Sequence, residues 1–167
     1  WNLEYDLQQL GFDYTYDKTL YDRLKNLDAE GVRLHLEAAE DYQDHSLRFL
    51  ENHDEERAAE TFGELANSNF ALLCFLPGSI LYHQGQREGK KVKIPVQLSR
   101  GPKETKDYLT EKFYDRAFEQ IQKRKNKNLE LEIFELKAYD VNYPLIDCIV
   151  RAVINKDFKY IGVLEKK

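Results

Sequence analysis

The chain has 167 residues, enough for one compact domain with a core but too few for a complete eight-stranded α/β barrel, which takes about 250 residues. Hydrophobic residues make up 42% and aromatic residues 13%, a composition that can bury a core and therefore excludes a disordered chain. The 25 basic and 30 acidic residues give a net charge of −5, which argues against a nucleic-acid partner. The longest apolar run, Phe70 to Leu76, ends at Pro77 and is too short to span a membrane.

The first third of the chain alternates between helical and strand-like patterns. Apolar residues at helical spacing predict helices over 2–10, 18–27 and 33–42. Gly11 is typical of the residue that follows a helix. Alternating aromatic and polar residues predict a strand over 12–16, and a short apolar run predicts a buried strand over 46–52.

Alternation continues to about residue 128 and then stops. The patterns predict a buried helix over 65–76, a turn at 77–79, a strand over 80–83, a basic loop over 85–100 and a long helix over 102–124. After that they predict only strands, over 129–133, 146–154 and 160–164. We therefore expect an α/β fold with parallel βα units in residues 1–128 and a β-rich module in residues 129–167.

Ionisable residues follow directly after the predicted strand at 46–52. Residues 52–57 read Asn-His-Asp-Glu-Glu-Arg, and in βα folds the carboxyl ends of the strands form the open mouth where catalytic groups lie. A carboxylate there can stabilise a positive transition state, and a neighbouring imidazole can donate to ligand hydroxyls. From the pattern alone, the favoured alternative is that Asp54 caps the next helix, with Glu55 and Glu56 in its first turn.

Other candidate features are weaker. His35 is expected to be solvated on a helix, and His83 either faces the mouth of the sheet or is hydrogen-bonded in the core. The aromatic residues in 12–16 either fill the core, which is favoured, or stack on sugar rings. The four histidines lack the spacing of a metal site, so we expect no metal, and no glycine-rich phosphate loop or cofactor motif is present.

Two motifs in order resemble a known family. The run Arg48-Phe49-Leu50-Glu51-Asn52-His53-Asp54 closely resembles the fourth signature region of the α-amylase superfamily, glycoside hydrolase family 13. The run from Phe75 to Gln86, with its Leu-Pro-Gly turn, is similar to the next strand of that family. The resemblance covers roughly residues 1–124 and implies strands 6 to 8 of a partial (β/α)8 TIM barrel with their helices. Residues 129–167 would then begin a C-terminal all-β domain.

The resemblance also implies roles for three residues. Asp54 matches the carboxylate that stabilises the oxocarbenium-like transition state, and His53 matches the imidazole that hydrogen-bonds the same sugar ring. Asn52 completes this substrate-binding motif and is expected mainly to shape the strand end. The ligand would be an α-glucan or a maltooligosaccharide.

The resemblance implies an incomplete active site as well. In the family a nucleophilic Asp and an acid/base Glu lie on earlier strands, and no Asp or Glu of this chain matches either one. We therefore expect a portion of a retaining glycoside hydrolase or glucanotransferase that is inactive as a separate chain. The chain starts with Trp1 and its N-terminus looks cut; no signal peptide is recognisable, which favours a cytoplasmic protein.

Two alternatives remain. The chain is a non-catalytic half-barrel module that binds carbohydrate or assembles with a partner chain, because a partial barrel leaves sheet edges open for self-association. Alternatively, it is an unrelated small α/β domain, which burial of residues 52–54 inside the sheet would favour.

Overall fold

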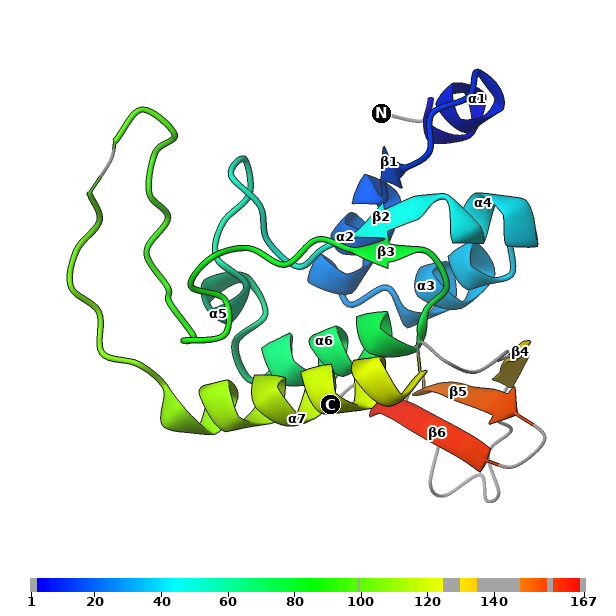
Figure 1. Ribbon diagram of the computed structural model, residues 1–167. Helices are drawn as coiled ribbons and strands as arrows, with labels where there is room; N and C mark the ends of the chain where they lie inside the picture. The colour runs from blue at the N-terminus through cyan, green and yellow to red at the C-terminus, as the bar shows by residue number, and fades with distance from the viewer. Residues whose placement is uncertain (1–2, 99, 125–129, 135–147, 156–157, 166–167) are drawn as a thin grey trace.

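The computed structural model describes residues 3–98, 100–124, 130–134, 148–155 and 158–165 (Figure 1). Its first part alternates helices and short strands, and its last part contains strands only, as predicted. The elements in chain order are α1 Glu4–Gln9, β1 Thr15–Tyr16, α2 Lys18–Lys25, α3 Ala29–Leu36, α4 Glu40–Asp44, β2 Ser46–Arg48, α5 Ala58–Thr61, the 3-10 turn η1 Gly63–Leu65, α6 Ala66–Phe75, β3 Ser79–Ile80, α7 Tyr108–Arg124, β4 Glu130–Phe134, β5 Cys148–Asn155 and β6 Phe158–Glu165.

The first sheet is parallel, with strand order β1-β2-β3. Thr15 pairs with Ser46, and Leu47 pairs with Ser79. The strands are shorter than the patterns predicted, because only two or three residues of each are paired. All three carboxyl ends meet at one edge, where the loop after β2 lies beside the loop after β3 (Figure 1).

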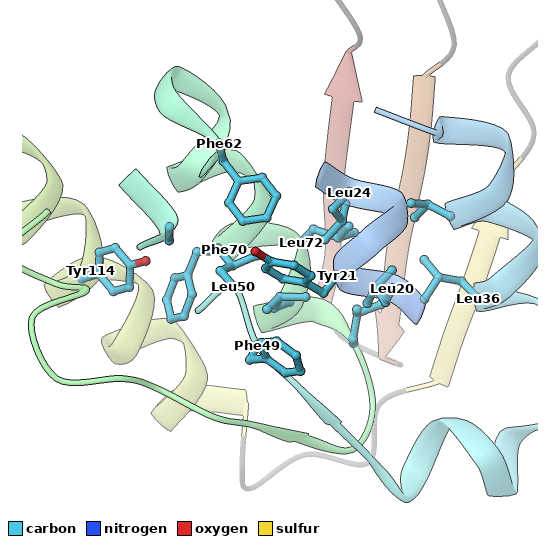
Figure 2. Close-up of a cluster of buried hydrophobic side chains, with 14 residues drawn as sticks. Leu20, Tyr21, Leu24, Leu36, Phe49, Leu50, Phe62, Phe70, Leu72 and Tyr114 are labelled. Carbon is cyan, nitrogen blue, oxygen red and sulfur yellow. The ribbon is translucent and has the colours of Figure 1, made fainter. Parts of the chain in front are cut away.

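A helical layer and an aromatic core support this sheet. Tyr21 of α2 stacks on Phe49, with ring centroids 5.3 Å apart, and packs edge-on against Phe62 (Figure 2). Phe70 of α6 lies 4.2 Å from the ring of Tyr114 of α7, so these two helices pack side by side. The core therefore joins α2 and α3 to α6 and α7 through the segment that follows β2.

Side-chain caps decide where several helices begin. The carboxylate of Asp17 accepts from the N–H of Leu20 at the start of α2, and Asp28 accepts from Gly31 at the start of α3. The predicted single helix over 33–42 is wrong. Because Asp28 starts α3 early and the backbone of Ala39 is extended, with ψ 142°, the segment divides into α3 and α4.

The long helix also begins later than predicted. Proline at 102 does not open it; instead Asp107 accepts from the N–H groups of Leu109 and Thr110, so α7 begins at Tyr108. Leu109 in the first turn of α7 is 81% exposed, whereas Tyr114 is buried. Residues 81–98 and 100–107, the long connection between β3 and α7, leave the parallel sheet, pass α5 and follow a long arch to the start of α7 (Figure 1).

The second sheet is antiparallel, with strand order β4-β5-β6. Leu131 pairs with Val153, and Val150 pairs with Val163. The predicted strands over 129–133, 146–154 and 160–164 fall within one or two residues of β4, β5 and β6, although residues 129, 146 and 147 lie outside the described residues. The described residues after 129 are therefore strands, as the patterns predicted, and their antiparallel pairing was not part of that prediction.

Candidate functional site

The loop that follows β2 at the carboxyl edge of the sheet contains all three predicted site residues. Asn52 is buried, and its Oδ1 accepts from the N–H of Asp54 at 2.8 Å and from the N–H of Glu55 at 2.9 Å. One side chain therefore folds the backbone of the loop into a tight turn. This geometry agrees with the expectation that Asn52 shapes the strand end.

The next two residues point to solvent. Nε2 of His53 lies 3.2 Å from Oδ2 of Asp54, and the two side chains are 55% and 72% exposed. The alternative in which Asp54 caps the next helix is wrong, because α5 begins only at Ala58. An exposed imidazole beside an exposed carboxylate can donate to and accept from the hydroxyls of a ligand.

The carboxylate of Glu51 lies beneath this loop and is completely buried. Its Oε2 accepts from the N–H of Ala58 at 2.6 Å, and its Oε1 lies 2.8 Å from Nη2 of Arg57. Burial raises the pKa of Glu51, and the Ala58 N–H and the Arg57 charge only partly oppose this shift. Sequence reasoning gave Glu51 no role in the site; a carboxylate inside an apolar strand, six residues before an arginine, is the signal that was available.

His83, in the loop after β3, contacts both Glu51 and Arg57. His83 Nδ1 lies 3.0 Å from Nη1 of Arg57 and 3.2 Å from Oε1 of Glu51. The side chain of His83 is one-third exposed, so both sequence-based alternatives for it hold in part: it lies at the mouth of the sheet and is hydrogen-bonded. Arg57 also donates to the carbonyl of Gln84 at 2.9 Å.

A second buried cluster lies under the sheet at the end of β1. Asp17 Oδ2 lies 3.2 Å from Nε of Arg48, and the Nε2 of His35 lies 2.9 Å from the other oxygen. Although burial disfavours the charged form, the hydrogen bond with His35 and the charges of His35 and Arg48 hold the pKa of Asp17 below its ordinary value. The prediction of a solvated His35 is wrong, because Asp17, far away in sequence, draws its ring into the core.

The face of the sheet opposite this cluster is exposed. Thr15 and Asp17 point toward the helices, so Tyr14 and Tyr16 point the other way. Tyr14 is 50% and Tyr16 38% exposed, and Phe12 is 55% exposed, so the favoured prediction that these rings fill the core is wrong. The ring of Tyr16 still packs edge-on against Phe49. Parallel sheets are normally covered on both faces, and among the described residues the face of Tyr14 and Tyr16 is the less covered one.

No group of His, Cys, Asp and Glu within the described residues could hold a metal ion. Nor is any described helix both long enough and apolar enough to cross a bilayer. A cavity of about 720 Å³ lies between the long connection and the helices, and Gln86, Asn67 and Tyr114 line part of it. The predicted site residues 52–54 do not line it.

Comparisons with known proteins identify the fold. No protein-family model and no curated protein matches the sequence. Solved structures do match: an α-amylase from H. orenii with a TM-score of 0.60 and 16% identity, over 92% of this chain and 39% of that one. A maltogenic α-amylase from Thermotoga neapolitana matches with a TM-score of 0.59 and 20% identity, over 97% of this chain and 39% of that one.

A third solved structure is also similar in fold. A cyclic α-maltosyl-(1→6)-maltose hydrolase from Arthrobacter globiformis matches with a TM-score of 0.57 and 20% identity, over 92% of this chain and 37% of that one. The chain is therefore similar in fold to part of each of these three proteins, which agrees with the resemblance seen in the sequence. This chain spans less than two-fifths of the length of each of these three.

Proposed function

We propose that this chain is the C-terminal portion of an α-amylase-type retaining glycoside hydrolase or glucanotransferase. In this proposal residues 1–128 supply strands 6 to 8 of a (β/α)8 barrel and residues 129–167 begin a C-terminal β domain. Asp54 is the carboxylate that stabilises the transition state, and His53 and Asn52 serve the same sugar subsite. The ligand is an α-glucan or a maltooligosaccharide.

One observation carries the proposal: the exposed His53–Asp54 pair at the carboxyl end of β2 in a fold of the α-amylase type. Active groups of parallel α/β folds gather at that end of the sheet. A carboxylate that is exposed and close to an imidazole is available to a ligand. A carboxylate that caps a helix would instead accept hydrogen bonds from the backbone N–H groups of that helix. The fold alone does not fix a function, so the pair and not the fold is what a test must probe.

The chain by itself is expected to lack hydrolytic activity. Retaining hydrolysis needs a nucleophile and an acid/base group with carboxyls about 5–5.5 Å apart. Among the described residues, no carboxylate of this loop is placed as such a partner of Asp54: Oε1 of Glu51 is fully buried 2.8 Å from Nη2 of Arg57, Oε1 of Glu55 lies 3.2 Å from Nζ of Lys18, and Oε1 of Glu56 lies 3.7 Å from Nζ of Lys93. We expect maltooligosaccharide binding without turnover.

Calorimetric titration with maltoheptaose and a hydrolysis assay on the same preparation test this proposal. The wild-type chain should bind the sugar and release no product, and Asp54→Asn should weaken binding about tenfold, because one charge-assisted hydrogen bond is lost. Glu60→Gln, an exposed carboxylate on α5, is the matched control and should bind as wild type does. Hydrolysis that Asp54→Asn abolishes would refute the inactive-portion proposal, and wild-type affinity in Asp54→Asn would refute the assigned site.

The open face of the parallel sheet favours a second candidate function. The exposed rings of Phe12, Tyr14 and Tyr16 lie at β1, which pairs on one side only among the described residues. They fit a non-catalytic half-barrel that assembles with another chain. Sugar binding that survives without any partner favours the first candidate, and a requirement for a partner chain favours the second.

A further inference from the structure

The loop with His53 and Asp54 is closed at its base by a buried carboxylate. Glu51 precedes the loop and Ala58 follows it, and the 2.6 Å hydrogen bond from the N–H of Ala58 to Oε2 joins these two ends. Oε1 of the same carboxylate lies 2.8 Å from the guanidinium of Arg57. Since Glu51 is fully buried and Arg57 nearly so, water does not compete for these contacts.

Arg57 extends this closure to the next βα loop. Its Nη2 donates to the carbonyl of Gln84 at 2.9 Å, and its Nη1 lies 3.0 Å from Nδ1 of His83. The same Nδ1 lies 3.2 Å from Oε1 of Glu51, so it accepts from Arg57 in one tautomer of the ring and donates to Glu51 in the other. The planar fork of arginine reaches Glu51, Gln84 and His83 together, and the single ammonium of lysine does not.

The turn after β3 is shaped to receive this guanidinium. Gly85 has a φ of +91°, and a Cβ at that position would lie 2.6 Å from Nη2 of Arg57. A side chain there would displace the guanidinium or the turn. The backbone of Gly85 therefore approaches the guanidinium of Arg57 closely enough that a Cβ at residue 85 would clash with it.

Two side chains hold the backbone of Asp54. Asn52 accepts from its N–H, and Lys93 of the long connection donates to its carbonyl at 2.6 Å. The carboxylate of Asp54 itself is exposed. The direction of the carboxylate therefore depends on the loop that carries it, and the base of that loop is set by Glu51 and Arg57.

We propose that Glu51, Arg57 and His83 form a positioning cluster that aligns the Asp54 loop with the loop after β3, so that sugar binding at Asp54 depends on residues that do not touch the sugar. This inference rests on the proposed function for its ligand but not for its geometry. Glu51→Gln keeps the size of the side chain and removes the charge that orders Arg57. Arg57→Lys keeps the cation and removes the fork.

The test measures loop geometry and sugar affinity separately, in the full chain. Amide NMR spectra without sugar should show that Glu51→Gln shifts the signals of residues 53–55 together with those of 83–85, while the signals of α2 and α3 stay in place. The Kd for maltoheptaose should rise about tenfold, the scale of one well-formed buried contact. Arg57→Lys should reproduce both effects with the fold intact, and the matched control Glu60→Gln should reproduce neither.

Three outcomes overturn the inference or separate it from the proposed function. Unchanged signals at 53–55 in both cluster variants would overturn it, and so would shifted signals with a wild-type Kd. If the wild-type chain binds no maltoheptaose, the proposed function fails, and the coupled shifts of 53–55 and 83–85 then decide the positioning role alone. If Glu51→Gln does not fold, Arg57→Lys decides the test.

Discussion

At the scale of single residues, the molecule separates exposed ligand-facing groups from buried charges that hold the backbone. His53 and Asp54 are exposed, whereas Glu51 and Asp17 lie in the interior with cationic partners. A buried charge whose partner is removed is costly, because the remaining ion has neither water nor a counter-ion. Substitutions of His53 or Asp54 should therefore change sugar binding and leave stability nearly unchanged, whereas loss of a buried charge such as Asp17 should lower stability.

Asp17→Asn should destabilise the fold strongly. The change leaves Arg48 buried without its counter-ion and removes the partner of His35, so we expect a loss of about 3–5 kcal/mol in the free energy of unfolding. Urea unfolding at neutral pH measures this. Asp13→Asn, an exposed aspartate two residues before β1, is the control and should change little. A loss below about 1 kcal/mol in Asp17→Asn would contradict the role of the ion pair.

The same residue predicts a pH dependence. The folded state lowers the pKa of Asp17, so its contribution to stability is present above the unfolded value of 3.8 and is lost as pH falls through the lower folded value. The difference in unfolding free energy between wild type and Asp17→Asn should therefore narrow as the pH falls below about 4. A difference that stays constant over that range would contradict the assignment.

At the scale of elements, the helices and strands that show a long periodic pattern were predicted correctly. The helix ends that a single capping side chain sets were not. The helices α2 and α6 and the change from alternating helices and strands to strands alone follow from periodicity. The antiparallel pairing of β4, β5 and β6 does not. The division of α3 from α4 and the late start of α7 depend on local caps at Asp28 and Asp107, which periodicity does not register.

The site shows the same division. Asn52, His53 and Asp54 are contiguous in sequence and were predicted together. Glu51 was not, because its partners are Ala58, seven residues later, and His83, on another strand. Likewise the buried position of His35 depends on Asp17, which only the folded sheet brings near. Long-range polar contacts of this kind leave no periodic signal in a single sequence.

One turn offers a test at this scale. Gly78 has a φ of +80°, and a Cβ there would lie 2.4 Å from the carbonyl oxygen of Ser46, so the turn before β3 packs directly on the start of β2. Gly78→Ala should destabilise the fold by more than about 1 kcal/mol, and by more than Gly11→Ala. Gly11 has a φ of +95° but open space around it, so that control isolates the backbone cost. If denaturant unfolding gave the same loss of unfolding free energy for both variants, the close approach of residue 78 to Ser46 would add no cost, and the prediction would be contradicted.

At the scale of the whole molecule, one face of the parallel sheet is more exposed than the other in the described part of the chain. Its two edge strands are β1 and β3, and the rings of Tyr14 and Tyr16 stand on its exposed face. Such a surface favours association with another polypeptide or with another copy.

We expect the wild-type chain to associate as its concentration rises, and the double variant Tyr14→Ser/Tyr16→Ser to do so less, because the apolar surface is reduced. Analytical ultracentrifugation across a concentration series measures this. Tyr108→Ser, which removes a ring that is 73% exposed at the far start of α7, is the control. A wild-type chain that stays monomeric throughout would contradict an associating face.

The central claim is that a sugar is bound at the loop after β2. An amide NMR titration of the full chain with maltoheptaose tests it most directly. The predicted result is saturable shifts concentrated at residues 52–56 and 83–86, which Asp54→Asn weakens. Saturable shifts confined to residues elsewhere, or no shifts at all at high sugar concentration, would contradict the account.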